Sequence, residues 1–166
     1  MEELVAKAGH QITITGTTLA VVPEIKNSLR RRIETGCNLR LMAPDPEGNH
    51  FDAGCCMTNS DTETRRNVIL ANLHEIGTFV SELGQIQDRV EVRLLNQPMP
   101  AGYTTIDLDE PAGQIIVQRY MFDVAAEDAE FLTYIANRDG DWYVQQREHL
   151  EKLWSKAKPY SLRPHS

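Results

Sequence analysis

The segment Gly16-Thr17-Thr18 carries the groups best suited to hold an anion. It directly follows QITIT, in which apolar and polar residues alternate. Backbone N–H groups and threonine hydroxyls at such a strand end can donate hydrogen bonds to a phosphate or carboxylate. We take all three residues as candidate ligand-binding residues. The plainer alternative is that Gly16 only ends the strand.

Aspartates supply a second set of candidates. Asp45 lies between two prolines, so its backbone is held in an extended turn. It could bind a ribose hydroxyl or a metal, or it could simply cap its own turn. Asp107 and Asp109 alternate in YTTIDLD, which places both on one face of a predicted strand, where two carboxylates could hold Mg²⁺. The alternative is a solvent-facing hairpin edge. We expect Tyr103 to line the same crevice as Asp107.

Histidine and cysteine form no recognisable metal-binding pattern. The five histidines and three cysteines include no CxxC or HxxxH spacing, so we predict no metal and no cofactor. Cys37, Cys55 and Cys56 are too few and too unevenly placed for a disulfide framework, which suits a reducing cytosol. We expect Cys37 to be a small buried residue. His50 is the one histidine that we single out for a catalytic test.

The stretch from residue 10 to residue 46 must position the first candidates. It predicts a strand in QITITG, a helix in PEIKNSLRRRIETG and a second strand in CNLRLMAP. Pro23 fits the first turn of that helix, and Gly36 fits a left-handed helix stop. A strand–helix–strand unit of this kind pairs its strands in parallel. The Gly16 and Asp45 loops then lie at the same edge of the sheet, where α/β proteins bind ligands.

The rest of the chain predicts a mixed sheet. We expect a long loop over residues 47–62, which could act as a flap, and then a long helix whose capping box is Ser60 and Glu63. RVEVRLL is a third strand, YTTIDLD and QIIVQRYMF form a hairpin, and FLTYIA is a sixth strand. Asp141 is expected to cap a last helix after an Asp-Gly-Asp turn. Trp154 would anchor that helix to the core.

Size and charge fit one globular α/β domain. The chain has 166 residues and a net charge of −7, and we assign residues 1–160 to a single domain and residues 161–166 to a frayed tail. The acidic balance makes duplex nucleic acid an unexpected partner. No apolar run reaches the ~18 residues of a membrane span, and the N-terminus is not a secretory signal, so we expect a cytoplasmic protein without membrane contact.

The order of these elements resembles one half of the phospholipase D-like superfamily. The resemblance runs from about His10 to Pro159 through ExxxxLRRRIETGCxLRLMAPDP, VEVRLL, IDLD, QIIVQRY and ExLWSKAKP. It is strongest to small bacterial domains in uncharacterised and regulatory proteins. The resemblance implies an α/β fold with a single mixed sheet flanked by helices. It also implies a homodimer, because active members pair two halves across a common face.

The catalytic motif of the superfamily is absent. Active members carry H-x-K-x4-D, in which histidine is the nucleophile and lysine holds the phosphate. With Asp107 as the aspartate, Pro100 and Gly102 occupy the other two positions; with Asp109, Gly102 and Thr104 do. A phosphohistidine route needs both the imidazole and the cation.

We therefore expect a catalytically inactive sensing or regulatory domain that binds a small phosphorylated or nucleotide ligand or a partner protein. The alternatives are a phosphodiesterase or nuclease with a rebuilt site, and a pure dimerisation domain.

Overall fold

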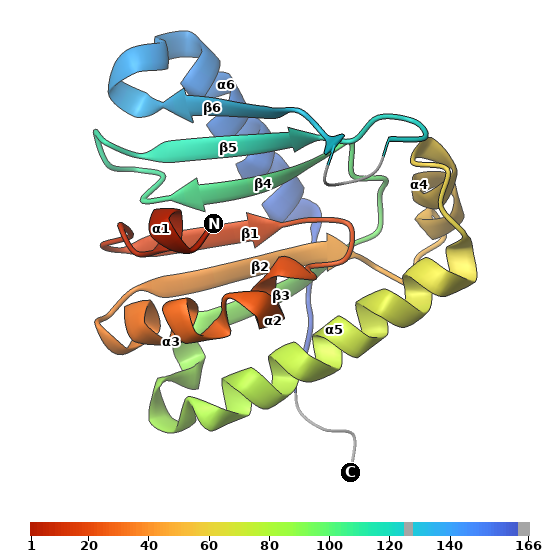
Figure 1. The fold of residues 1–166 in the computed structure, drawn as a ribbon, viewed down its shortest axis with the longest axis horizontal. Helices are drawn as coiled ribbons and strands as arrows, with labels where there is room; N and C mark the ends of the chain where they lie inside the picture. Colours follow the sequence, from red (N-terminus) through yellow and green to blue (C-terminus); the bar gives the residue numbers. More distant parts are fainter. Residues whose placement is uncertain (125–127, 163–166) are drawn as a thin grey trace.

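The computed structural model describes residues 1–124 and 128–162 of the chain. They form one seven-stranded mixed sheet in the order β6-β5-β4-β1-β2-β3-β7 (Figure 1). The strands are β1 (Gln11–Thr15), β2 (Asn38–Pro44), β3 (Val90–Leu95), β4 (Ala101–Ile106), β5 (Gln114–Arg119), β6 (Phe131–Ile135) and β7 (Lys158–Pro159).

The centre of the sheet is parallel and its flanks are antiparallel. Strands β1, β2 and β3 run in parallel, with Gln11 opposite Asn38 and Leu39 opposite Val90. The predicted strand–helix–strand unit is therefore confirmed. Strand β4 pairs antiparallel with β1, and β5 and β6 continue antiparallel beyond it. The α/β class, the mixed sheet and the β4–β5 hairpin all agree with the prediction.

Helices cover both faces of this sheet unequally. The helices are α1 (Glu2–Val5), α2 (Val21–Glu24), α3 (Lys26–Glu34), α4 (Phe51–Met57), α5 (Thr62–Glu82) and α6 (Ala136–Lys156), with a 3₁₀ turn η1 (Gly84–Arg89). In Figure 1, α1, α2, α3 and α5 lie in front of the sheet, and α6 lies behind it. The front of β4, β5 and β6 carries no helix in this view.

Two apolar cores follow from this arrangement. The larger core packs the apolar stripes of α3 and α5 on alternate residues of β1, β2 and β3, including Ile12, Leu41 and Val92. The smaller core packs α6 on the other face, where Leu150 and Trp154 meet β3, β4 and β5. The expected role of Trp154 as a core anchor agrees with its burial. Cys37 is buried, also as expected.

The predicted helix over residues 23–36 is in two pieces. Ile25, with φ −106° and ψ 15°, separates α2 from α3, and Pro23 is the third residue of α2. The predicted stop at Gly36 is correct, because its φ of 108° lies in the left-handed region that favours glycine.

The predicted loop over residues 47–62 is wrong in its middle. Residues 51–57 form α4, which buries Phe51 and Cys55 one turn apart in the larger core. The glycine inside this short helix hides the pattern in the sequence. The long helix that follows is capped by Asp61 rather than Ser60, since the Asp61 carboxylate accepts from the N–H of Thr64 at 2.7 Å.

The strand and turn predictions near the remaining aspartates also need correction. Strand β4 ends at Ile106, so Asp107 and Asp109 do not alternate on a strand. Asp141 does not cap the last helix. Helix α6 begins at Ala136 and is kinked at Gly140 (φ 49°), and Asp139 accepts from the N–H of Ile135 at 2.6 Å.

The tail assigned to residues 161–166 lies outside the described residues from position 163 onward. Just before this tail, Lys158–Pro159 form the edge strand β7, which the sequence analysis did not predict. Among the described residues, no helix has both the length and the apolar composition that crossing a bilayer requires.

Candidate functional site

The Gly16-Thr17-Thr18 loop lies at the carboxyl edge of the parallel strands, as predicted. The N–H of Gly16 donates to the carbonyl of Met42 at 3.1 Å, which fixes the loop against β2. The carbonyl of Thr18 accepts from Asn72 Nδ2 of α5 at 2.9 Å. Thr17 lines three hollows that surround this loop, so it stands at their common border.

Tyr120 completes this loop from the other side. It follows β5, and its hydroxyl accepts from the N–H of Thr17 at 3.2 Å. The phenol lies over Gly102, where a Cβ atom would approach the hydroxyl to 2.5 Å and the carbonyl of Thr15 to 3.1 Å. Only glycine fits at position 102 while Tyr120 stays in place. Burial raises the pKa of Tyr120, so the phenol is neutral at physiological pH.

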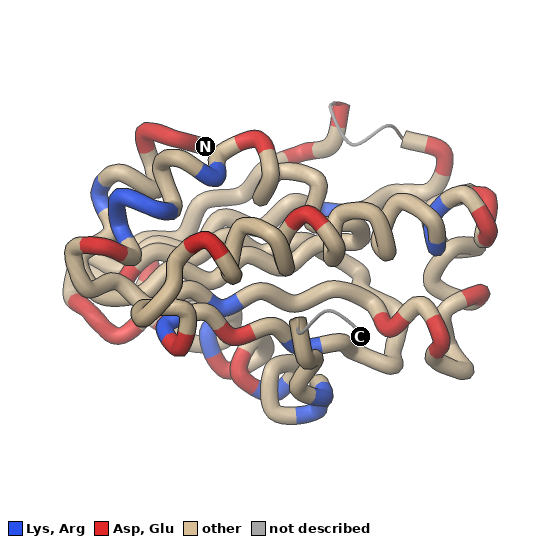
Figure 2. The backbone as a smooth tube through the Cα atoms, turned by 90° about the horizontal axis from the view of Figure 1, so that it is seen from below, with Lys and Arg blue, Asp and Glu red and all other residues tan. Residues whose placement is uncertain are grey.

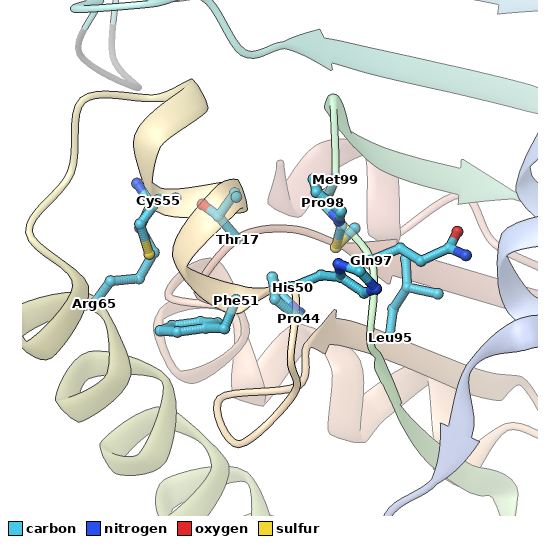
Figure 3. Close-up of a pocket in the computed structure, with 11 residues that line it drawn as sticks. Thr17, Pro44, His50, Phe51, Cys55, Arg65, Leu95, Gln97, Pro98 and Met99 are labelled. Carbon is cyan, nitrogen blue, oxygen red and sulfur yellow. The ribbon is translucent and has the colours of Figure 1, made fainter.

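The first of the three hollows is nearly filled. It lies between α4 and the connection from β3 to β4, where Thr17 and Pro44 face Phe51 and His50 (Figure 3). Its free volume is about 10 Å³, which leaves room for about one water molecule. This hollow therefore does not accommodate a nucleotide or a sugar phosphate without movement of α4.

A larger hollow opens on the other side of Thr17. It has a volume of about 400 Å³. Two arginines, Arg65 of α5 and Arg119 of β5, are among the residues that line it. Hydroxyl groups line it as well, from Thr17, Thr58, Ser60 and Tyr120. Guanidinium and hydroxyl groups are the donors that phosphate oxygens prefer.

Arg65 is the central cation of this hollow. Its side chain is half-buried and donates to the hydroxyl of Ser60. Within residues 1–124 and 128–162 it forms no ion pair, whereas Arg30, Arg40 and Arg93 each meet a glutamate. Among the described residues of the lining, Asp123 is the one with a carboxylate, and it accepts from Asn59 Nδ2 at 2.9 Å. Arg65 therefore presents a positive charge that no described carboxylate neutralises.

Asp45 serves its own turn. Its carboxylate accepts from the N–H of Glu47 at 3.1 Å, and its carbonyl accepts from the N–H of Gly48 at 3.0 Å. These contacts match the turn-cap alternative. Asp45 lies at the same sheet edge as Thr17, but it does not line any of the three hollows around that residue.

Asp107 lies at the opposite edge of the sheet. Its φ is 48°, and its carboxylate accepts from the N–H groups of Gly9, His10 and Gln11 at 2.7, 2.7 and 2.9 Å. These three residues precede or begin β1, whereas Thr17 follows it. The structure thus does not bring Asp107 and Thr17 into one site.

Tyr103 is buried in the smaller core. Its N–H donates to the hydroxyl of Thr15 at 3.0 Å, and its ring lies 6.0 Å from the ring of His149 on α6. Burial raises the pKa of its phenol. It therefore faces away from the Gly16 loop and from Asp107. No group of three or more potential metal ligands occurs among the described residues.

Sequence reasoning missed Arg65, Arg119 and Tyr120. Tyr120 and Arg119 reach the Gly16 edge because β4 returns antiparallel to β1, so β5 ends at the same edge as β1. The predicted hairpin contained that information. The role of Arg65 could not be predicted, because its contact with Ser60 depends on where α5 begins relative to α4.

Comparison with known proteins identifies the fold. Neither protein-family models nor curated proteins match the sequence. Among solved structures, the phospholipase D family member Nuc from Salmonella typhimurium superimposes with a TM-score of 0.55 at 12% identity, covering 96% of this chain and 87% of Nuc. Phosphatidylserine synthase from Haemophilus influenzae Rd KW20 gives a TM-score of 0.60 at 12% identity. The fold is phospholipase D-like.

A third match is TrmBL2, an archaeal chromatin protein whose structure shows a novel mode of DNA binding. Its TM-score is 0.57 at 15% identity over 95% of this chain. The present chain spans 47% of TrmBL2 and 36% of the phosphatidylserine synthase, so it is shorter than these proteins by half or more. Identities of 12–15% establish the shared fold alone.

Tyr120 also lies against two positions that the sequence analysis compared with the superfamily motif. With Asp107 as the motif aspartate, the lysine position is Gly102 of β4, and the Tyr120 phenol covers it. The histidine position is Pro100, whose carbonyl accepts from the N–H of Tyr120 at 3.2 Å. Tyr120 thus contacts both positions, and the hollow that contains Arg65 begins next to them.

Proposed function

We propose that this chain is a phospholipase D-like domain without the superfamily's phosphohistidine chemistry, and that it binds a small phosphorylated ligand as a sensing or regulatory module. The observation that carries the proposal is Arg65. It is a half-buried guanidinium that faces a hollow of about 400 Å³ beside Thr17 and Tyr120. A small phosphorylated metabolite or a mononucleotide fits a site of this size.

Charge supports an anionic ligand. The chain as a whole carries −7, and its acidic and basic positions are interspersed along the backbone (Figure 2). Against that background, Arg65 and Arg119 meet in one lining with hydroxyl donors. A phosphate group would accept from both guanidiniums and would give Arg65 the negative partner that it does not find among the described residues.

The proposed absence of phosphohistidine chemistry rests on two positions. Neither Pro100 nor Gly102 can supply a nucleophile or a cation, and Tyr120 fills the space over Gly102. His50 of the rebuilt-enzyme alternative lines the nearly filled hollow, and it does not line the one with the two arginines. These observations favour ligand binding without turnover over a rebuilt phosphodiesterase.

The test is a thermal-shift titration with pyrophosphate, glucose 6-phosphate and AMP, with glucose and adenosine as uncharged controls. A ligand at 100 times its dissociation constant adds about 2.7 kcal/mol to the native state. That corresponds to roughly 5–10 °C for a domain of this size. We expect Arg65→Gln to abolish the shift. The exposed Arg31→Gln, on α3, removes the same charge remote from the hollow and should leave the shift unchanged.

Two results would contradict the proposal. One is the absence of any thermal shift with every phosphorylated compound at about 10 mM. A dissociation constant above roughly that concentration corresponds to very weak binding. The other is an Arg65→Gln variant that responds like the wild type. A duplex DNA oligonucleotide belongs in the same series, because TrmBL2 shares the fold. We expect no shift with it at physiological salt, given the net charge.

A further inference from the structure

The phosphate hollow does not end at Tyr120. A second hollow, of about 290 Å³, begins on the other side of this residue, and both hollows share Thr17 and Tyr120 as lining residues. The second hollow lies over the front of β1, β4 and β5, next to the part of the sheet that carries no helix in Figure 1. The Tyr120 phenol therefore stands between two adjoining spaces.

The two spaces have different chemistry. Among the described residues, no Lys, Arg, Asp or Glu lines the second hollow; Met1, which carries the α-amino group, and several threonines do line it. Its apolar lining comes from the sheet, from the segment that enters α2 and from Met1, and it includes Ile14, Leu19, Val21, Ile116 and Phe131. Phe131 is 56% exposed, although it lines this hollow, so its ring is available to a ligand. Large exposed apolar side chains beside a pocket are a usual mark of a binding surface.

We propose that the two hollows form one bipartite site for a phosphate monoester whose ester group is aromatic or otherwise apolar. The phosphate would lie at Arg65 and Arg119, and the ester group would pass Tyr120 and cover Ile116 and Phe131. This inference rests on the proposed function and adds the ligand class to it. A mononucleotide and an aryl or alkyl phosphate share this chemistry.

The fold explains why the second space exists. Ile116 and Phe131 come from β5 and β6, and Ile14 comes from β1, so the antiparallel flank of the sheet forms the floor. The α3 and α5 helices pack on β1, β2 and β3 instead, which leaves that floor uncovered. Gly102, on β4 between β1 and β5, has no side chain, and the Tyr120 phenol lies over it.

The experiment compares four ligands by calorimetry: inorganic phosphate, phenyl phosphate, hexyl phosphate and AMP. Burial of a ring or a hexyl chain should make the esters bind at least about tenfold more tightly than phosphate. Phe131→Ala should remove most of that gain and leave the affinity for inorganic phosphate unchanged. AMP binding tightly while hexyl phosphate binds like phosphate would assign the second space to nucleobases, and the reverse would assign it to flexible apolar chains.

Leu132→Ala is the matched control. Leu132 is the next residue on β6, is exposed by 40%, and does not line either hollow. Its removal should change neither affinity. Equal affinity for phosphate and all three esters would overturn the bipartite site while leaving the phosphate site in place. Equal effects of Phe131→Ala and Leu132→Ala on ester binding would have the same consequence. No binding of any of the four compounds would overturn the proposed function itself.

Discussion

At the residue scale, the Asp107 carboxylate is a structural group. It accepts from three consecutive backbone N–H groups, those of Gly9, His10 and Gln11, and so fixes the entry into β1. Burial tends to raise the pKa of Asp107, but the three hydrogen bonds and the neighbouring His10 outweigh it, and the pKa lies below its usual value.

We predict that Asp107→Ala lowers the free energy of unfolding by about 2 kcal/mol, since hydrogen bonds to a charged group contribute about that much. Asp109→Ala is the control, because Asp109 is exposed and forms a long ion pair of 3.5 Å with Arg147. Urea unfolding at pH 7 measures both. Similar losses in the two variants would be inconsistent with a structural role for Asp107.

The same contact predicts a pH dependence. A carboxylate whose pKa is lowered in the folded state stabilises the protein above the pKa of the unfolded chain, about 3.9, and loses this effect as the pH falls through the lowered value. The difference in unfolding free energy between the wild type and Asp107→Asn should therefore be constant near neutral pH and shrink in acid. A difference that grows as the pH falls below 4 would argue against this assignment.

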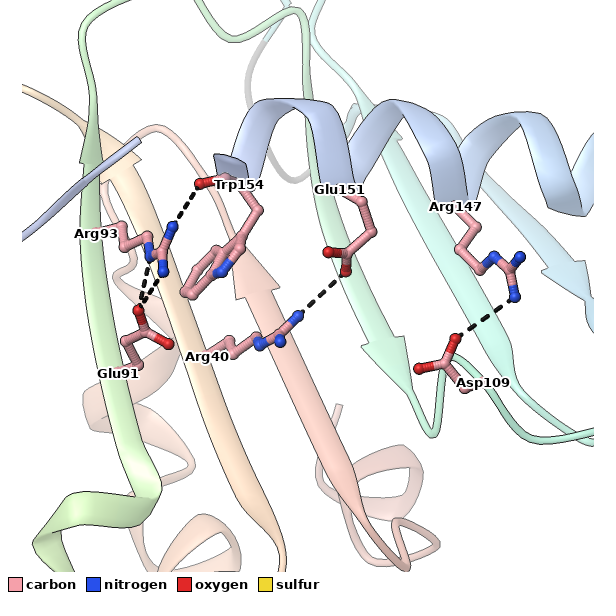
Figure 4. A network of polar contacts seen from close by, with 7 residues as sticks. All are labelled: Arg40, Glu91, Arg93, Asp109, Arg147, Glu151 and Trp154. Carbon is pink, nitrogen blue, oxygen red and sulfur yellow. Dashed lines mark hydrogen bonds and ion pairs between the residues drawn. The ribbon is translucent and has the colours of Figure 1, made fainter. Parts of the chain in front are cut away.

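At the element scale, Trp154 holds α6 on the sheet. The guanidinium carbons of Arg40 and Arg93 lie 5.2 and 4.6 Å from its ring centre, and Arg93 also donates to its carbonyl at 3.0 Å (Figure 4). Glu151 and Glu91 pair with the two arginines and complete the network. The ring itself is buried in the smaller core.

We expect Trp154→Ala to cost about 3–5 kcal/mol, the usual loss for a large buried aromatic side chain. The second tryptophan of the chain, Trp142, is 65% exposed, so Trp142→Ala should change stability by no more than about 0.5 kcal/mol. Chemical denaturation monitored by far-ultraviolet circular dichroism reads both. A loss under 1 kcal/mol for Trp154→Ala would mean that α6 is held mainly by other residues.

The edge strand β6 is protected by the first turn of α6. Strand residues 131–135 carry no charge, which makes an exposed edge prone to pair with another chain. Arg138 Nη2 donates to the carbonyl of Thr133 at 2.8 Å, and Asp139 accepts from the N–H of Ile135 at 2.6 Å. The backbone groups of successive strand residues point alternately to the two sides. Glu130 and Ala136 bond toward β5, so Thr133 and Ile135, at the alternate positions, direct their backbone groups to the outer side of β6.

Removing this protection should cause self-association. We predict that the double variant Arg138→Ala/Asp139→Ala has a larger mass than the wild type in light scattering at rising protein concentration. Asp141→Ala, which removes a nearby exposed charge, is the control. An unchanged mass for the double variant would show that the two side chains do not guard the edge.

At the scale of the whole molecule, the fold was predictable and the site was only partly so. The strand–helix–strand unit and the hairpin follow from local alternation and from residues such as Gly36. Helix α4 does not follow from such local patterns, because Gly54 interrupts an apolar pattern that is only two turns long. Arg65, Arg119 and Tyr120 meet Thr17 only after antiparallel pairing brings the end of β5 beside the end of β1, and single-segment patterns do not encode that meeting.

The association state remains a prediction of the superfamily resemblance. We expect a homodimer in solution, as in members that pair two halves. Light scattering of the wild type at micromolar concentration decides the matter, and it also sets the reference mass for the β6 variants. A monomer at that concentration would contradict the expected pairing and would remove support for the pure dimerisation domain.

The most direct test of the central claim is an amide proton–nitrogen correlation spectrum recorded during titration with AMP. The account predicts shift changes that saturate and gather at Thr17, Ser60, Arg65 and Tyr120, with AMP recovered intact at the end. Changes confined to Gly9, His10 and Gln11, at the opposite edge around Asp107, would contradict it. So would a spectrum that stays unchanged at millimolar AMP.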